Sequence, residues 1–391
     1  MIGRKQIVIL GCLLMIGLAG LCGCGSPSSD SMERVETEAD HAADVPGGLT
    51  YESSMELQYA KNFSVDDYEG GYKILKTMDG TQILVVPEEK EVPDGISKDV
   101  VVVKQPVKNL YVVSSSIMDI FSKLDAMDTI RLSSQKEEDW YVQDAKDAME
   151  RGDILYAGKY SKPDYELIVS ENCSLAIENT MITHSPEVSE MLADFDIPTM
   201  IEYSSYESHP LGRVEWVKFF GALIGKDELA QKVFNEEVRL VDEVTSVEKT
   251  DKTVAFFYVT SNGLIQVRSS SDYVPKMINL AGGNYIPTNI GDPDSKRSTV
   301  SMQIEDFYDQ AKDADFIIYN SSIDGGIGSV QELLDKCAVL KDFKAVKEGN
   351  VWCTTNDMYQ QSMSIGYLIH DMHAMLQGKD QVDMTYLFHV E

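Results

Sequence analysis

The segment His209-Pro-Leu-Gly-Arg-Val-Glu-Trp-Val-Lys-Phe-Phe-Gly-Ala-Leu-Ile-Gly lies near the middle of the chain and carries apolar residues at helical spacing. A proline directly after His209 suits the first turn of a helix. The helical pattern continues through Ala230 to Val244, with a candidate break at Gly225-Lys-Asp. These features predict a long backbone helix over residues 209–247.

Short apolar runs alternate with helical stretches, such as Pro186 to Asp194, on both sides of this segment. Strands separated by helices are typical of βαβ units and a largely parallel sheet. The sequence therefore predicts an α/β fold of two Rossmann-like lobes, residues 99–208 and 248–391, joined by the backbone helix. The expected strands are Val100-Val-Val-Val, Leu110-Tyr-Val-Val, Asp153-Ile-Leu-Tyr-Ala-Gly, Ser174-Leu-Ala-Ile-Glu, Pro198-Thr-Met-Ile-Glu, Val254-Ala-Phe-Phe-Tyr-Val, Leu264-Ile-Gln-Val, Phe316-Ile-Ile-Tyr and Val351-Trp-Cys-Thr.

Residues 49–98 have a different pattern, with strand-like runs and no helical periodicity. Two of these runs, beginning at Tyr72 and Thr81, flank the dipeptide Asp79-Gly80. Asp-Gly between two strand-like runs is a hairpin signal. We expect a small β-meander added ahead of the first lobe.

The N-terminus has the layout of a lipoprotein signal peptide. Arg4 and Lys5 precede an apolar run from Ile7 to Leu18, which is short for a membrane span. The run ends in Leu-Cys-Gly followed by Cys24, the pattern that lipoprotein signal peptidases cleave. We expect a signal peptide over residues 1–23, a lipidated (palmitate-carrying) Cys24, and a disordered tether over residues 24–48. The alternative is an uncleaved signal anchor. The predicted location is the extracytoplasmic face of the cell membrane.

Charge and cysteine content exclude several classes of function. The formal net charge is -30, and such a surface repels phosphate backbones, so we expect no nucleic-acid partner. Outside the export segment, Cys173, Cys337 and Cys353 are odd in number and widely scattered. They form neither a disulfide framework nor a zinc-site spacing.

From about Val100 to the C-terminus, the order of local motifs resembles the solute-binding proteins of ABC importers for ferric siderophores, heme and cobalamin. Each motif alone is weak, and their order and spacing together are more specific. The motifs are Lys162-Pro-Asp-Tyr-Glu-Leu-Ile, Leu175-Ala-Ile-Glu, Glu190-Met-Leu-Ala-Asp-Phe-Asp-Ile-Pro-Thr-Met, the segment opening at His209, Ile278-Asn-Leu-Ala-Gly-Gly, Val300-Ser-Met-Gln-Ile-Glu, Ala314-Asp-Phe-Ile-Ile and Lys344-Ala-Val-Lys-Glu-Gly-Asn-Val-Trp. The resemblance does not cover the β-meander or the tether.

The resemblance implies a monomeric receptor that holds its ligand between the lobes and docks on an ABC permease in the same membrane. In the family, one exposed carboxylate on each lobe meets arginines of the permease. Glu166 and Glu305 fall at the matching places. Charge pairs at a rim steer docking and fix its register. The alternative is that each is an ordinary solvated glutamate at a helix start, favoured by the helix dipole.

The cleft of such a fold is built from loops at the carboxyl ends of strands. These loops and the start of the backbone helix provide aromatic, hydroxyl and arginine side chains for a flat or chelated anionic ligand. For Arg213, a salt bridge at the start of the helix is the favoured alternative. The tyrosines could equally be rim or half-buried residues. The candidate ligand-binding residues are Ser115, Trp140, Tyr160, Tyr203, Tyr206, Arg213, Arg268, Tyr273 and Tyr359.

Direct metal ligation and catalysis have little support. His370-Asp-Met-His373 has helical i, i+3 spacing but lacks a third ligand in the sequence nearby. Neither a Gly-x-Ser-x-Gly elbow nor a zinc-protease helix is present. We therefore expect no catalytic residue, no resident cofactor and no direct metal site. The leading function is capture of a ferric siderophore for an ABC importer, with heme and cobalamin as alternative ligands. An alternative of another class is a surface lipoprotein that scavenges or processes a tetrapyrrole without an importer.

Overall fold

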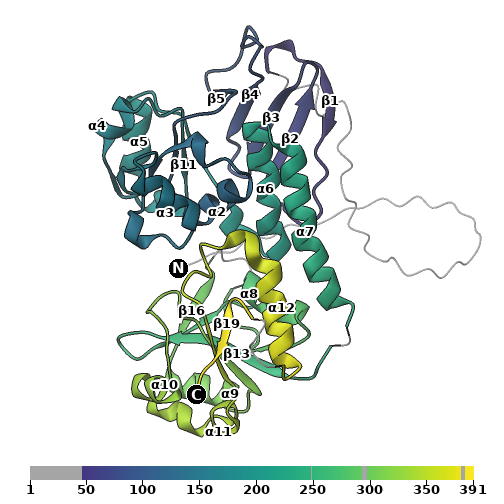
Figure 1. The fold of residues 1–391 in the computed structure, drawn as a ribbon, viewed down its shortest axis with the longest axis vertical. Helices are drawn as coiled ribbons and strands as arrows, with labels where there is room; N and C mark the ends of the chain where they lie inside the picture. Colours follow the sequence, from purple (N-terminus) through teal and green to yellow (C-terminus); the bar gives the residue numbers. More distant parts are fainter. Residues whose placement is uncertain (1–45, 248, 293–296, 380–383) are drawn as a thin grey trace, which may run out of the picture. The chain divides into compact units, whose positions relative to one another are not determined.

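The fold was analysed in a computed structural model that describes residues 46–247, 249–292, 297–379 and 384–391 (Figure 1). The predicted signal peptide, the lipidation site Cys24 and nearly all of the predicted tether lie outside the described residues. Within the described ranges, every helix is too short or too polar to cross a bilayer.

The first part of the described chain is a five-stranded sheet with the strand order β1-β2-β3-β4-β5. Its first four strands pair in antiparallel fashion, and the hairpin predicted at Asp79-Gly80 is present, with Gly80 at a φ of 90°. The fifth strand pairs parallel to β4, with Val102 opposite Leu84. The strands are β1 (Tyr51–Ser54), β2 (Phe63–Tyr68), β3 (Tyr72–Thr77), β4 (Gln82–Val86) and β5 (Val100–Lys104).

One expectation about this region was wrong. The run Val100-Val-Val-Val was placed in the first lobe, but it forms β5 of the N-terminal sheet. The physical reason is that β4 offers β5 a ladder of five residue pairs and a shared small core under the sheet. An apolar run shows that a strand is buried, but it does not show which neighbour the strand pairs with.

The first lobe has a fully parallel sheet in the order β12-β11-β6-β7-β8. The chain starts at the central strand, moves outward to β8, and then returns to add β11 and β12 on the other side. The strands are β6 (Leu110–Val112), β7 (Ile130–Ser133), β8 (Leu155–Tyr156), β11 (Leu175–Glu178) and β12 (Thr199–Ile201), with a small β9 (Gly158–Lys159) and β10 (Lys162–Pro163) hairpin. The helices are α2 (Ser115–Lys123), α3 (Gln143–Glu150), α4 (Tyr165–Ser170) and α5 (Pro186–Asp194).

The predicted backbone helix is a hairpin of two helices, α6 (Pro210–Ile224) and α7 (Asp227–Thr245). Gly225 ends α6 in the left-handed conformation, at a φ of 74°. The two helices run antiparallel and pack closely. A Cβ atom at Gly221 of α6 would meet the side chain of Ala230 of α7, and the ammonium of Lys218 lies over the ring of Phe234. The break expected at Gly225-Lys-Asp is therefore a complete reversal of the chain.

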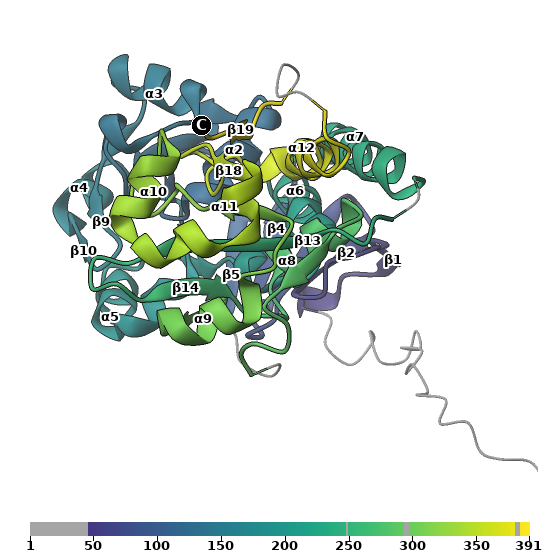
Figure 2. The same cartoon turned by 90° about the horizontal axis from the view of Figure 1, so that it is seen from below.

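The second lobe has a mixed sheet in the order β16-β14-β13-β17-β18-β19, with β15 paired to β13. Figure 2 shows this lobe from below, with α9, α10 and α11 in the foreground. Helices α9, α10 and α11 pack on one face of this sheet, and α8 and α12 pack on the other. The strands are β13 (Thr253–Val259), β14 (Ile265–Arg268), β15 (Asn284–Ile286), β16 (Thr299–Met302), β17 (Phe316–Tyr319), β18 (Val351–Thr354) and β19 (Leu387–His389). The helices are α8 (Tyr273–Leu280), α9 (Ile304–Ala311), α10 (Val330–Lys336), α11 (Lys344–Glu348) and α12 (Ile365–Leu376).

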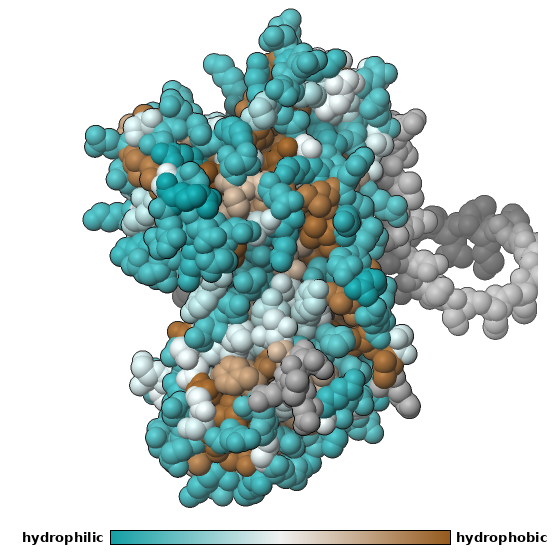
Figure 3. All heavy atoms as spheres, viewed as in Figure 1, coloured by the Kyte–Doolittle hydropathy of each residue, from teal (hydrophilic) through white to brown (hydrophobic). Residues whose placement is uncertain are grey.

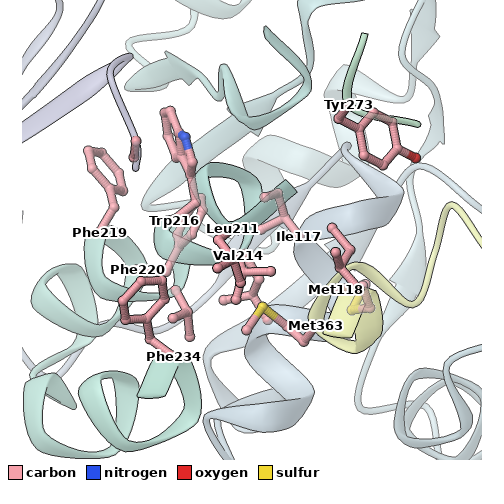
Figure 4. Close-up of a cluster of buried hydrophobic side chains, with 14 of the residues drawn as sticks. Ile117, Met118, Leu211, Val214, Trp216, Phe219, Phe220, Phe234, Tyr273 and Met363 are labelled. Atoms are coloured by element: carbon pink, nitrogen blue, oxygen red, sulfur yellow. The ribbon is translucent and has the colours of Figure 1, made fainter. Parts of the chain in front are cut away.

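A continuous core joins these parts around α6, which is buried on almost every side. Figure 4 shows its aromatic centre, where Trp216, Phe219 and Phe220 of α6 lie near Phe234 of α7. Phe63 of the N-terminal sheet packs edge-on against Trp216, at 4.9 Å between ring centroids. The core therefore makes the N-terminal sheet a packed part of the fold, and both lobes contribute side chains to the same cluster.

Candidate ligand-binding cleft

A cavity of about 1750 Å³ is lined by residues of both lobes. On the first lobe it lies at the carboxyl ends of β6, β11 and β12, where Ser114, Asn179 and Glu202 follow the strands. Ligands of open α/β sheets bind at this position, beside the strand at which the order reverses. The volume exceeds the roughly 300–1,000 Å³ of an ordinary small-molecule pocket, so a large ligand can enter. In Figure 3 the surface where the lobes meet is pale, which indicates side chains of intermediate hydropathy.

The first-lobe wall is rich in hydroxyl groups held by a buried carboxylate. Glu202, which is 1% exposed, accepts hydrogen bonds from the Oγ of Ser114 at 2.7 Å and from the backbone N–H of Ser204 at 2.9 Å. This carboxylate ties the start of α2 to the loop after β12. The wall is therefore pre-formed, and serine hydroxyls on both segments face the cavity lining.

Arg213 lies in the first turn of α6 and lines the cavity. Its Nε donates to the carbonyl of Glu207 at 3.2 Å and its Nη2 donates to the carbonyl of Ser205 at 2.5 Å. The guanidinium carbon lies 3.7 Å from the centroid of the Tyr273 ring. The salt bridge favoured from sequence is absent among the described residues, and carbonyls with an aromatic face take its place.

Arg268 forms the second-lobe counterpart and is 7% exposed. Its Nε and Nη2 bind the two carboxylate oxygens of Asp272 at 2.8 and 2.7 Å, a bidentate geometry that fixes the guanidinium plane. Its Nη1 donates to the hydroxyl of Tyr359 at 3.3 Å, and Asn320 donates to the same hydroxyl at 2.9 Å. The Tyr359 oxygen thus accepts hydrogen bonds from two donors, which fix the position of its hydroxyl in the cavity lining.

Six of the nine residues predicted to bind ligand line this one cavity: Ser115, Tyr206, Arg213, Arg268, Tyr273 and Tyr359. Tyr160 lines a smaller pocket of about 240 Å³, which shares Ser115 and Asn179 with the large cavity. Residues from distant parts of the sequence are therefore brought together, while their contact with a ligand stays a prediction.

The structure contradicts two of the predicted positions. Trp140 is 1% exposed and packs in the main core, and its Nε1 has no hydrogen-bond partner among the described residues. Tyr203 is 8% exposed and packs in the main core beside the Tyr206 ring, with its hydroxyl near Asp79 of the N-terminal sheet and away from the cavity lining. In both cases the loop directs the ring inward, and a sequence does not reveal that direction.

Other lining residues were missed because they do not directly follow a predicted strand. Tyr258 and Gln266 lie within β13 and β14, and Tyr386 lies in the C-terminal segment before β19. Arg297 also lines the cavity, just beyond a stretch that the structure does not describe. The alternation of side chains between the two faces of a strand did not identify these residues. It shows which face of the sheet a side chain occupies, whereas the cleft lies at the edge of the sheet.

Glu166 and Glu305 are both exposed, in the first turns of α4 and α9. Both positions suit docking and suit an ordinary helix-start glutamate equally well, so docking stays a prediction.

Metal-binding side chains are engaged elsewhere. His373 Nδ1 hydrogen-bonds to the carbonyl of Ala281 at 2.9 Å, and the carboxylate of Asp371 accepts the backbone N–H groups of residues 385–387. No group of three or more His, Cys, Asp or Glu that could hold a metal ion occurs among the described residues. The three described cysteines, Cys173, Cys337 and Cys353, are free.

Sequence comparison finds relatives that are lipoproteins without an assigned function, and no family model matches the chain. One uncharacterized lipoprotein of Methanocaldococcus jannaschii is 22% identical over 378 residues, covering 91% of this chain and 89% of its own. A second from the same organism is 24% identical over 407 residues, covering 99% and 100%.

Solved structures with a similar fold are periplasmic binding proteins. The heme-binding protein HutB of Vibrio cholerae matches with a TM-score of 0.55 and 13% identity, covering 67% of this chain and 97% of its own. A protein of Staphylococcus epidermidis is described as a possible iron-binding solute-binding protein. It matches with a TM-score of 0.54 and 16% identity, covering 70% of this chain and 99% of its own. A periplasmic binding protein of Veillonella parvula matches with a TM-score of 0.56 and 15% identity, covering 71% of this chain and 93% of its own. The chain therefore has the two-lobed α/β fold of the periplasmic solute-binding proteins.

Proposed function

We propose that this chain is the extracytoplasmic receptor of an ABC importer and that it binds a ferric siderophore in the cleft between its lobes. The observation that carries the proposal is the pair of arginines in one large cavity. The guanidinium carbons of Arg213 and Arg268 lie 3.7 and 5.7 Å from the centroid of the same ring, that of Tyr273. Arg213 has no ion-pair partner among the described residues, so its charge attracts an anionic chelate and repels a free metal cation, whereas the charge of Arg268 is paired with Asp272.

The polarity of the lining favours a siderophore over an apolar macrocycle. Serine residues of both lobes, including Ser115, Ser205, Ser301 and Ser362, line the cavity together with Asn320. Groups of this kind donate and accept hydrogen bonds to the oxygen atoms of a chelate and orient it. The similar solved structures for iron and heme support an iron-containing ligand.

Heme is the second candidate, and Tyr359 is the observation that favours it. Its oxygen accepts hydrogen bonds from Asn320 and from Arg268, which fix the hydroxyl in the cavity lining. Tyrosine is one of the side chains that hold heme iron in proteins. If heme is bound in this way, Tyr359→Phe will abolish the ligand-to-iron absorption band while retaining the fold. Cobalamin remains a third member of the same ligand class.

A binding panel tests the proposal directly. The mature chain is titrated with ferric citrate, ferrichrome, hemin and cyanocobalamin, and its intrinsic tryptophan fluorescence is recorded. We expect tight binding of one iron chelate, and at least about tenfold weaker binding for Arg268→Gln, which removes a buried charged donor. Arg239→Gln, on the exposed face of α7, is the matched control. Tight binding of Zn²⁺ or Mn²⁺, with none of the four chelates bound, would overturn the proposed ligand class.

The anchor and the importer need separate tests. We propose that Cys24 carries the lipid, so Cys24→Ala should release the chain from the membrane fraction and eliminate palmitate labelling. We also propose that Glu166 and Glu305 dock on the permease. Reversal of both charges to lysine should abolish uptake and leave chelate affinity intact, whereas Glu190→Lys on exposed α5 should leave both unchanged. Permease and ATPase genes beside this gene would favour import over tetrapyrrole scavenging without an importer.

A further inference from the structure

The loop between β12 and α6, residues Tyr203–His209, connects the cleft to the N-terminal sheet. We call this segment the cleft loop. Three of its consecutive residues, Ser204, Ser205 and Tyr206, line the cavity. Arg213 also depends on the loop, because its guanidinium donates to the carbonyls of Ser205 and Glu207. The position of the cleft loop therefore sets the position of four cavity residues.

The first attachment of the cleft loop to the N-terminal sheet is the buried carboxylate of Glu207, which is 3% exposed. It accepts the backbone N–H of Lys61 at 3.0 Å and that of Asn62 at 2.9 Å, just before β2. The indole N–H of Trp216 donates to the same carboxylate at 3.3 Å. A buried charge with three donors is costly to move, because each donor would lose its partner.

The second attachment comes from the tip of the β3–β4 hairpin. The hydroxyl of Tyr203 lies beside the carboxylate of Asp79, and the two groups interact electrostatically. Asp79 is itself fixed by the hydroxyl of Thr77 at 2.6 Å and by the backbone N–H of Thr81 at 3.1 Å. The Tyr203 ring then packs on the Tyr206 ring, at 5.6 Å between centroids. A continuous chain of contacts thus leads from the hairpin to a side chain that lines the cavity.

The third attachment is aromatic. The imidazole of His209 stacks on the ring of Tyr59, with 4.5 Å between centroids and 24° between planes. Directly behind it, a Cβ atom at Gly212 would lie 3.1 Å from the carbonyl oxygen of Tyr59, so the chain segments approach as closely as a glycine allows. All three attachments act on the side of the loop away from the cavity.

We infer that the N-terminal sheet is a positioning part of the ligand-binding site, and that it sets ligand affinity by holding the cleft loop through Tyr203 and Glu207. The two-lobed fold itself forms without this requirement, because solved structures of that fold are matched over nearly their whole length by only part of this chain. The effect on affinity rests on the proposed function, whereas the hold on the loop does not.

The experiment compares three conservative variants of the full mature chain. Tyr203→Phe removes the hydroxyl that lies beside Asp79 and keeps the ring, and Asp79→Asn removes the charge beside that hydroxyl. The matched control is Tyr72→Phe, which removes a tyrosine hydroxyl from the same sheet, where it donates to the carbonyl of Glu91 at 2.9 Å. Hydrogen exchange is measured without ligand at the amides of Ser204, Tyr206 and Glu207, each of which donates a hydrogen bond. Affinity is then measured with hemin and with ferric citrate as probes.

We expect exchange at these three amides to rise about fivefold or more in Tyr203→Phe and Asp79→Asn, with the rest of the chain unchanged. Whichever probe binds should bind about three- to tenfold more weakly in both variants, and Tyr72→Phe should match the wild type in both measurements. Unchanged exchange, or faster exchange with unchanged affinity, would overturn the inference. If neither probe binds to the wild-type chain, the proposed function is in question and the exchange rates alone decide whether the sheet holds the loop.

Discussion

Buried carboxylates hold main-chain segments in two regions of this protein, and the regions differ in how many donors each carboxylate receives. In the helical hairpin, Glu215 of α6 accepts four hydrogen-bond donors from the chain around it. At the junction with the second lobe, Asp119 of α2 and Glu237 of α7 each accept one backbone N–H. The same chemical group therefore serves as a permanent anchor in one region and as a titratable contact in the other.

Glu215 is completely buried and binds the backbone N–H groups of Gln58, Tyr59 and Ala60 at 2.8–2.9 Å. The ammonium of Lys218, 4% exposed, lies 2.9 Å from the same carboxylate. The carboxylate is thus bound by three backbone N–H groups and an ammonium group in a fully buried site. This arrangement ties the segment before β2 to α6 and keeps the N-terminal sheet on the helical hairpin.

Asp119 and Glu237 bind the start of α12, accepting from Met363 at 2.7 Å and from Gly366 at 2.6 Å. Burial raises the pKa of Asp119 to about 6 and that of Glu237 to about 7. The single backbone N–H that each carboxylate accepts lowers its pKa, but by less than burial raises it. The other titratable groups around the pair are mostly acidic and raise the pKa further: Asp144, Glu236 and Asp357, with Lys123 opposing them and Tyr386 nearby. We therefore expect the stability of the lobe junction to change with pH in the range in which these two carboxyl groups titrate.

The largest expected effect is the loss of the permanent anchor. In Glu215→Gln, the ammonium of Lys218 stays buried without its counter-charge, and one amide donor loses its acceptor. Breaking a buried ion pair in this way costs about 3–5 kcal/mol of unfolding free energy. Urea denaturation measures the change, and Glu190→Gln on the exposed face of α5 should stay within about 0.5 kcal/mol of the wild type. A loss below about 1 kcal/mol would mean that water or a rearranged backbone satisfies Lys218.

The anchors could not be predicted from the sequence, although much of the fold could. Pro186–Asp194 was predicted as a helix with the bounds that the structure shows, because proline starts it and its apolar residues repeat at helical spacing. Strand Leu175–Glu178 was likewise evident from its apolar run. In the sequence, Glu207 looks like an ordinary loop carboxylate and Glu215 like an ordinary helix carboxylate. Their partners lie 145–157 residues away, and hydrogen bonds to the backbone leave no trace in residue type.

The cleft shows the same limit from another side. The rule that loops after strands build the cleft correctly brought Ser115, Tyr206 and Tyr359 to one cavity. It failed for Trp140, because an aromatic residue after a strand can turn into the core or into the cleft. Local pattern fixes which element carries a residue, and long-range packing decides which way its side chain points.

The second effect in size concerns the titratable contacts. Because the folded-state pKa of Asp119 and Glu237 lies above the ordinary value, the folded chain binds protons more tightly than the unfolded chain. The stability from this proton binding is complete below about pH 4 and is lost as pH rises through about 6 for Asp119 and about 7 for Glu237. Between pH 5 and pH 8, the wild type should lose about 2 kcal/mol more unfolding free energy than Glu237→Gln, whose side chain does not titrate.

Urea denaturation at several pH values measures this difference, and Glu228→Gln, exposed in the first turn of α7, is the matched control. Burial also raises the pKa of Glu178 to about 8, which contributes a slope of the same sign. That slope is common to the wild type and the variants, so it cancels in the comparison. Parallel curves for the wild type and Glu237→Gln would contradict this prediction, because they would mean that Glu237 titrates near its ordinary value.

The smallest expected effect comes from a third contact between the lobes, which is neutral and partly exposed. The side chain of Gln360 accepts the backbone N–H of Tyr141 at 2.8 Å and donates to the carbonyl of Asp139 at 2.8 Å. Because water can replace both bonds, Gln360→Ala should cost about 1 kcal/mol or less, equally at pH 5 and pH 8. Gln377→Ala, at the exposed end of α12, provides the baseline. The amide of Gln360 has no charge to titrate. A pH-dependent loss in Gln360→Ala would therefore mean that its hydrogen bonds break together with those of Asp119 and Glu237 near the start of α12.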